Sequence, residues 1–102
     1  MLTDPDTASA GETFTMTLFG RESHVTRIGL NTQGVFSDVL TRRLPNGWRF
    51  GLPNEVFRAP DGAIFDMVGI GPDIRVPVFA EEDVAAGRDP ALARALRVLG
   101  RE

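Results

Sequence analysis

The sequence contains neither cysteine nor lysine, and these two absences remove several kinds of chemistry. Without cysteine, these 102 residues can form no disulfide, no thiolate nucleophile and no thiolate metal site. Without lysine, they can form neither a Ser–Lys dyad nor a Schiff base. All 11 strongly basic residues are arginine, and His24 is the single histidine. The chemistry that remains must come from hydroxyls, carboxylates, guanidinium groups and His24.

Long charge runs and long apolar runs are also missing. The formal net charge is −3, with 11 basic and 14 acidic residues scattered along the chain, so we expect no nucleic-acid partner. No apolar run has membrane-spanning length, and Met1–Asp6 is too short and too acidic for a signal peptide. The hydrophobic share of 42% indicates a folded chain, either one small domain or part of a larger one.

The first third of the chain predicts a strand–helix–strand unit. Met1–Thr3 has the character of a strand end stopped by a proline turn, which suggests that the chain begins inside a domain. Residues 9–19 predict a helix closed by Gly20, and residues 24–30 a second strand that would run parallel to the first. The loop Asn31–Gly34 would then lie at the carboxyl end of that strand, where open α/β sheets place ligand-contacting backbone.

The remainder predicts a hairpin, an edge strand and two helices. Residues 35–44 and 48–57 would form the hairpin around Pro45-Asn46-Gly47, with Trp48, Phe50, Leu52 and Val56 sharing a core face. Pro60-Asp61-Gly62 is a further turn. The last strand is expected over 74–78 and the helices over 81–86 and 89–99, which makes the fold class α/β.

Ser9 lies in a small-residue turn at the start of the first predicted helix. The spacing Ser9-x-x-Glu12 is that of a capping box, in which each residue satisfies a free donor of the other. A serine at such a turn could also be a nucleophile beside unpaired backbone N–H groups. Spacing alone favours the helix cap, because capping boxes are common and catalytic serines are rare.

Other candidate residues give weaker signals. His24 is a whole helix away from Ser9, which favours a strand-entry histidine over a catalytic base. Asp66 interrupts an apolar, glycine-rich stretch, so it either faces solvent on a bend or pairs with a buried group. The pair Gly69 and Gly71 lacks the third glycine of a dinucleotide fingerprint, and no metal or cofactor pattern is present.

Seven short motifs, in order along the chain, resemble the carboxyl-terminal part of the catalytic domain of the C-terminal processing (tail-specific) serine peptidases. The resemblance is to their tricorn-like branch, and it extends to about Val78. The motifs are Leu2-Thr3-Asp4-Pro5, Thr7-Ala8-Ser9-Ala10-Gly11-Glu12, Val25-Thr26-Arg27-Ile28-Gly29, Thr32-Gln33-Gly34, Leu44-Pro45-Asn46-Gly47, Pro60-Asp61-Gly62 and Val68-Gly69-Ile70-Gly71-Pro72-Asp73-Ile74.

The resemblance implies an incomplete crotonase/Clp-protease-like β-β-α catalytic domain over residues 1–80, with a helical extension of the same domain over 81–102. It implies that Ser9 is the nucleophile and that the backbone N–H of Ala10 is half of the oxyanion hole. Asp66 would correspond to the glutamate that helps orient the catalytic histidine, although it is one methylene shorter.

The chain also departs from the family pattern. Val35 follows Gly34 where the lysine-dependent branch has its general base, and Leu30 replaces a usual glutamate. The tricorn-like branch takes its histidine and a second oxyanion donor from regions upstream of the serine that this sequence does not include. The resemblance therefore predicts a peptidase fragment that lacks its histidine base and is inactive by itself.

Two functions follow from this resemblance. The first is a fragment of a peptidase that hydrolyses peptide or protein substrates through an acyl-enzyme on Ser9. The alternative is a non-catalytic peptidase-like remnant that binds peptides or assembles through an open sheet edge. Both predict self-association or pairing with a missing upstream segment. Because such peptidases are often exported, the resemblance leans toward the bacterial periplasm for the parent protein.

Overall fold

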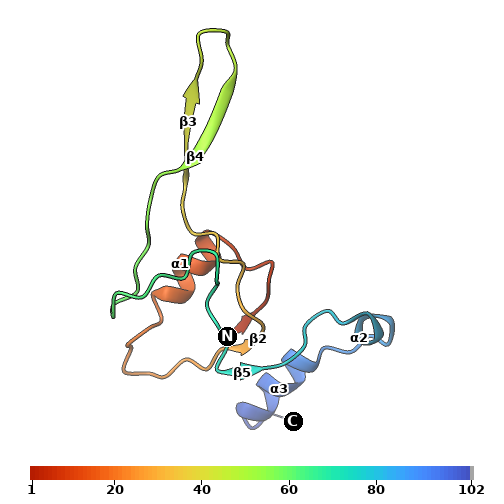
Figure 1. The fold of residues 1–102 in the computed structure, drawn as a ribbon. Coiled ribbons are helices and arrows are strands. Elements are labelled where there is room, and N and C mark those ends of the chain that lie inside the picture. The colour runs from red at the N-terminus through yellow and green to blue at the C-terminus, as the bar shows by residue number, and fades with distance from the viewer. Residues whose placement is uncertain (102) are drawn as a thin grey trace.

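A short parallel sheet, a separate β-hairpin and helices at both ends of the chain make up the structure, a computed structural model that describes residues 1–101 (Figure 1). The elements in chain order are β1 (Leu2–Thr3), α1 (Ala10–Met16), β2 (Ile28–Gly29), β3 (Val39–Arg43), β4 (Arg49–Pro53), β5 (Ile74–Arg75), α2 (Glu81–Ala85) and α3 (Pro90–Val98). The predicted mixed α/β architecture is confirmed.

The parallel sheet has the strand order β1-β2-β5. Ile28 lies opposite Leu2 on one side and Ile74 on the other, so the predicted parallel pair of strand ends is confirmed. Both β2 and β5 are shorter than predicted. Gly29 has φ of 132°, and a Cβ there would collide with the carbonyl of Thr3, so the two chains approach at a point where only glycine fits.

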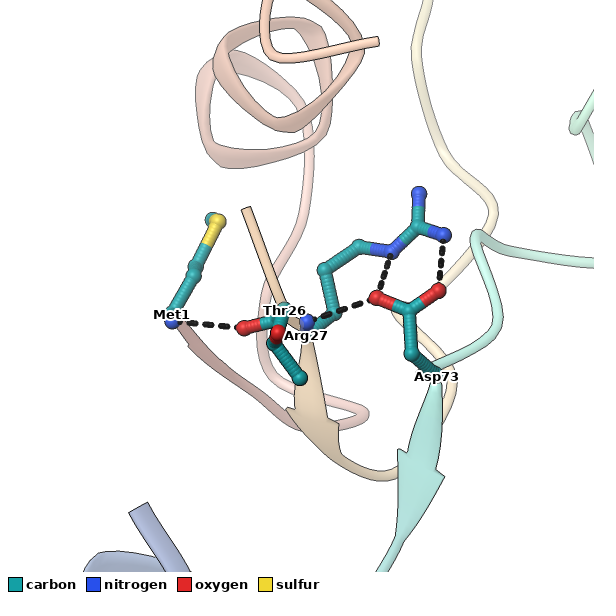
Figure 2. A network of polar contacts seen from close by, with 4 residues as sticks. All are labelled: Met1, Thr26, Arg27 and Asp73. Carbon is teal, nitrogen blue, oxygen red and sulfur yellow. Dashed lines mark hydrogen bonds and ion pairs between the residues drawn. The ribbon is translucent and has the colours of Figure 1, made fainter. Parts of the chain in front are cut away.

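A side chain ends the ladder before β2 (Figure 2). The backbone N–H of Arg27 donates to Oδ2 of Asp73 at 2.7 Å, and its guanidinium group bonds both carboxylate oxygens. The nitrogen of Met1 donates to the carbonyl of Thr26 at 2.9 Å. On the side of β5, the Asp73 carboxylate therefore takes the Arg27 donor that a neighbouring strand would use, and the pairing of β2 with β5 begins only at Ile28.

Helix α1 begins at Ala10, one residue after the predicted start, and ends at Met16 rather than at residue 19. The chain then continues in hydrogen-bonded turns, in which Leu18 and Phe19 bond carbonyls three residues back. Gly20 closes them with φ of 66°, the left-handed conformation expected of it. The buried Thr15 donates its hydroxyl to the carbonyl of Gly11 at 2.7 Å, within the helix.

The hairpin forms where the sequence predicts it, but it is not part of the core. Two hydrogen bonds close the turn: the N–H of Leu44 donates to the carbonyl of Trp48, and the N–H of Gly47 donates to the carbonyl of Leu44. Gly47 has φ of 88°. Every residue of β3 and β4 is exposed, and the hairpin stands away from the rest of the chain (Figure 1). The predicted core face is therefore wrong in this chain, because nothing packs over it: the exposed fractions are 73% for Trp48, 42% for Phe50, 60% for Leu52 and 64% for Val56.

The predicted C-terminal helices are confirmed with slightly shorter bounds. Asp89 caps α3 by accepting the N–H of Leu92 at 2.9 Å, with Pro90 at the first helical position. The helix packs against β1 and β2, and Ala91 is its buried residue. The predicted leucine face remains on the surface, and Leu92 is 45% exposed. The buried apolar residues are Ile28, Phe36, Ala59, Ile70 and Ala91.

Candidate functional site

Ser9 occupies a strained turn immediately before α1. Its φ of 48° and ψ of −114° are values that glycine tolerates and that other residues rarely adopt. The backbone N–H of Ser9 donates to the carbonyl of Val35 at 2.8 Å, which ties the turn to the loop after β2. The residue itself is exposed. The fold therefore holds an exposed serine in a backbone conformation that is unfavourable for a residue with a Cβ.

The capping relationship between Ser9 and Glu12 is formed mainly from the glutamate side. Oε2 of Glu12 accepts the backbone N–H of Ser9 at 3.3 Å. The N–H of Glu12 donates to the carbonyl of Ser9 at 2.9 Å, and the Ser9 side chain faces the same N–H in the geometry of a capping box. A cap uses the hydroxyl oxygen only as an acceptor, so the hydroxyl proton of the exposed Ser9 is not used by the cap.

Glu12 is the buried anchor of the site, a role that the sequence analysis missed. It is fully buried, and its two oxygens accept four hydrogen bonds. Oε1 accepts the hydroxyl of Thr32 at 2.5 Å and the N–H of Gly34 at 2.7 Å. Oε2 accepts the N–H of Val35 at 2.7 Å in addition to that of Ser9. The sequence held two separate signals for this network. One is the glutamate three residues after Ser9, at the start of the predicted helix, and the other is the Thr32-Gln33-Gly34 loop.

Thr32 extends the network from the serine turn to a third segment. Its hydroxyl oxygen accepts the N–H of Ile70 at 2.7 Å, and its own N–H donates to the carbonyl of Ile70 at 3.1 Å. Thr32 and Ile70 are both buried. The loop Asn31–Gly34, predicted as a site candidate from its position in the sheet, thus lies between the serine turn and the glycine-rich segment before β5.

Ala10 supplies a free donor next to the serine. It is the first residue of α1, so its N–H has no acceptor within the helix. Within residues 1–101 no other acceptor bonds this N–H, and Ala10 is exposed. A backbone donor adjacent to an exposed serine hydroxyl has the composition of half an oxyanion hole.

Asp66 lies on a tight turn that contacts the same loop. The N–H groups of Val68 and Gly69 donate to the carbonyl of Phe65, and the N–H of Met67 donates to the carbonyl of Gly34 at 2.8 Å. Asp66 is half-buried, and its carboxylate forms no hydrogen bond or ion pair within the described part of the chain. Of the two sequence interpretations, the structure shows the bend and not the buried partner. It brings the Asp66 segment to the loop that holds Ser9.

His24 lies apart from the serine turn. It is exposed, and it lines two open cavities, one with Phe19 and Arg27 and the other with Met1 and Leu99. Ser9 lines neither cavity, and the whole of α1 and its following turns separate the two residues along the chain. No hydrogen bond joins His24 to Ser9 in the described part of the chain, and the two residues share neither cavity.

Residues 1–101 contain no cluster of three or more histidine, cysteine or acidic side chains that could hold a metal ion. Among the same residues, no helix has the length and apolar character needed to cross a membrane.

The site thus combines a short parallel strand, a strained turn carrying an exposed serine, and a helix, with a free backbone N–H after the serine. A strained, exposed serine followed by a free backbone N–H has the composition of a nucleophile beside half an oxyanion hole. The sequence profile of peptidase family S41 matches residues 1–76, and the chain belongs to that family. No curated protein sequence matches the chain significantly.

Solved structures of peptidases share the fold. A candidate peptidase from Parabacteroides merdae superposes with a TM-score of 0.77 at 29% identity, over 96% of this chain and 30% of that one. The tricorn protease gives 0.79 at 28% identity, over 96% of this chain and 10% of its own. Mature CPAF shares the fold with a TM-score of 0.73, at 18% identity, over 98% and 19%. The chain therefore spans less than a third of the length of the first two of these structures.

Proposed function

We propose that Ser9 is the nucleophile of a serine peptidase site, of which this chain carries one half. The observation that supports this most directly is the left-handed backbone of Ser9, because a helix cap needs no such strain. In this proposal Oγ of Ser9 bonds to the substrate carbonyl carbon and its proton passes to a base. The peptide C–N bond then breaks, the amine leaves with the proton, and water hydrolyses the acyl-enzyme.

The base and one oxyanion donor would come from residues outside these 102. Val35 occupies the position of the base in lysine-dependent relatives, and the only histidine, His24, follows α1 and its turns along the chain. Ala10 would donate its N–H to the developing oxyanion. Asp66 would orient the imidazole of the incoming histidine, consistent with a half-buried carboxylate that has no other partner in the described chain. We expect the 102-residue chain alone to be inactive.

Labelling with a fluorophosphonate probe tests this proposal. The probe should leave Ser9 unmodified in the isolated chain and should modify it in a longer polypeptide that supplies the upstream histidine. Tandem mass spectrometry should place the adduct on the peptide that contains Ser9. Labelling that survives Ser9→Ala in the longer polypeptide would sink the assignment, and Ser23→Ala is the matched control.

The exposed surface supports the alternative of an assembly module. The chain exposes 7245 Å², whereas a compact protein of 11.1 kDa exposes about 5,700 Å². Its radius of gyration is 17.2 Å against about 13 Å for a compact chain of this length. The excess of about 1,500 Å² is roughly twice what one partner contributes to a standard interface. We propose that the hairpin pairs with a second copy or with further polypeptide.

One face of the hairpin supplies much of this surface. The cross-strand pairing puts Leu40 opposite Leu52 and Arg42 opposite Phe50 on the same face. A two-stranded hairpin with no cover is marginal in water, so a partner on this face would stabilise it. We also propose that residues 81–102 belong to the same domain as 1–80, supported by the packing of α3 on β1 and β2.

Sedimentation velocity at increasing concentration tests the assembly proposal. The chain should self-associate, and Phe50→Ser with Leu52→Ser should shift it toward monomer. Arg43→Gln, on the opposite hairpin face, is the matched control. A single monomeric species at all concentrations, in wild type and variants alike, would count against self-association.

A further inference from the structure

Three exposed apolar residues belong to segments whose backbone is hydrogen-bonded to the serine turn or to the loop that holds it, and the proposed chemistry does not use their side chains. Val35, Met67 and Val68 have exposed fractions of 50%, 91% and 66%. The carbonyl of Val35 accepts the N–H of Ser9, and the carbonyl of the preceding residue, Gly34, accepts the N–H of Met67, each at 2.8 Å. Met67 is therefore bonded to Gly34, and the next residue of the loop, Val35, is bonded to Ser9.

Met67 is held in a conformation that side chains seldom adopt. Its φ is 64°, and only Ser9 and Phe79 share a positive φ among the other non-glycine residues from 1 to 101. Two contacts on its C-terminal side enforce this turn. Nδ2 of Asn31 donates to the carbonyl of Val68 at 3.2 Å, and the backbone of residues 67–69 packs directly on Gly34. The same loop thus fixes two strained residues, the serine and this methionine.

Gly34 shows how closely the two segments meet. A Cβ on this glycine would lie 2.8 Å from the backbone nitrogens of both Val68 and Gly69. The turn at Met67 therefore packs directly on the backbone of the loop, without an intervening side chain. The backbone of Met67 is held in position, while its side chain is exposed to solvent. A flexible thioether with a fixed origin is suited to contact apolar groups of varied shape.

We propose that Met67, with Val35 and Val68, forms a subsite for an apolar side chain of a peptide substrate. The occupant is the side chain of the residue whose carbonyl Ser9 attacks, or of its neighbour. This inference rests on the proposed function. An extended peptide advances about 3.3 Å per residue, so residues next to the scissile bond fall within reach of a loop that bonds directly to Ser9. A carboxylate is disfavoured there, because Asp66 immediately precedes Met67.

Two measurements test the subsite independently of each other. The first is amide chemical-shift mapping of the isolated chain with blocked leucine and aspartate peptide amides. The leucine peptide should shift the signals of Met67, Val68 and Val35, and the aspartate peptide should not. The second is the rate at which peptide phosphonates with leucine or alanine side chains modify Ser9 in the longer polypeptide.

The variants are chosen to keep the backbone intact. Met67→Asn tolerates a left-handed conformation, and Met67→Gly removes its strain, so both should fold. Each should lower the leucine-to-alanine rate ratio about tenfold. Ile64→Asn, an exposed apolar position in the same segment, should leave the ratio unchanged.

The outcomes separate this inference from the function on which it rests. If Ser9 is never modified but the leucine peptide still shifts Met67, the proposed peptidase function fails and the apolar subsite stands. If Ser9 is modified with a rate ratio that Met67→Asn and Met67→Gly leave intact, the subsite is wrong. A leucine peptide that shifts no signal around Met67 also overturns it.

Discussion

The buried carboxylate of Glu12 accepts the hydroxyl of Thr32 at 2.5 Å, and this contact joins the serine turn to the loop after β2. The same two residues connect three segments that are far apart in the sequence, because Thr32 in turn bonds Ile70. The geometry of Ser9 is therefore set by groups more than twenty residues away, in addition to its own turn.

Glu12→Gln should lower the free energy of unfolding by about 2–4 kcal/mol. The amide nitrogen of glutamine would face N–H donors that the carboxylate oxygen now accepts, which leaves buried donors unpaired. The measurement is the midpoint of urea unfolding followed by circular dichroism. Glu22→Gln, at an exposed glutamate, is the control and should change the midpoint little. A loss below about 0.5 kcal/mol for Glu12→Gln would show that the network contributes little.

Ser9→Gly should raise the stability of the chain by about 1 kcal/mol, because glycine adopts the φ and ψ of this turn without strain. Ser9→Ala removes the same hydroxyl but retains the strain, so it should show no such gain. Both variants should abolish labelling in the longer polypeptide. Thermal unfolding of the three proteins checks the first part. Equal melting temperatures for the glycine and alanine variants would mean that the turn is not strained.

Gly34→Ala should destabilise the chain more than Gly20→Ala. Both glycines have positive φ, 84° and 66°, so both substitutions carry the conformational cost of a left-handed alanine. Only at Gly34 would the added methyl also meet backbone, whereas nothing lies within 4 Å of the corresponding position at Gly20. We expect Gly20→Ala to cost about 1 kcal/mol and Gly34→Ala at least twice that. Equal urea midpoints would contradict the close approach of the two segments.

Asp73→Asn should lower the free energy of unfolding at neutral pH, and the loss should be smaller in acid. The hydrogen bonds from the Arg27 guanidinium group hold the pKa of the Asp73 carboxyl below its ordinary value of 3.8. The stabilisation is therefore complete above that ordinary value and is lost as the pH falls through the lowered pKa of the folded state. Because the pair is partly exposed, we expect the substitution to lower the free energy of unfolding by about 0.5–1 kcal/mol at neutral pH.

Urea midpoints near neutral pH and at about pH 2 measure this effect. Wild type should lose stability over that interval more steeply than Asp73→Asn, and the two should converge in acid. Asp6→Asn, at an exposed aspartate, should follow the wild-type curve. Parallel curves for wild type and Asp73→Asn would show that the ion pair with Arg27 does not contribute to the pH dependence.

The elements of the fold were largely predictable because their signals are local. A proline turn after Thr3, glycine after each helix, Pro45-Asn46-Gly47 between two apolar runs and Asp89-Pro90 before α3 act through the conformations of a few neighbouring residues. The lengths of β2 and β5 were not predictable. The start of their pairing lies beside the Asp73 side chain, which takes the N–H of Arg27, a contact across 46 residues.

The sequence by itself determined the family, the parallel strand pair, the hairpin and the position of Ser9 at a helix start, since each depends on residue order and spacing. Only the tertiary structure decided that Trp48 and its neighbours lie in solvent, because burial depends on what packs against a face. It also decided that Glu12 is more than a cap residue, since three of its four donors come from the loop after β2 and reach the carboxylate only when that loop packs on the serine turn. Hydrogen bonds between distant segments leave almost no pattern along the chain, and at this site they hold the serine in place.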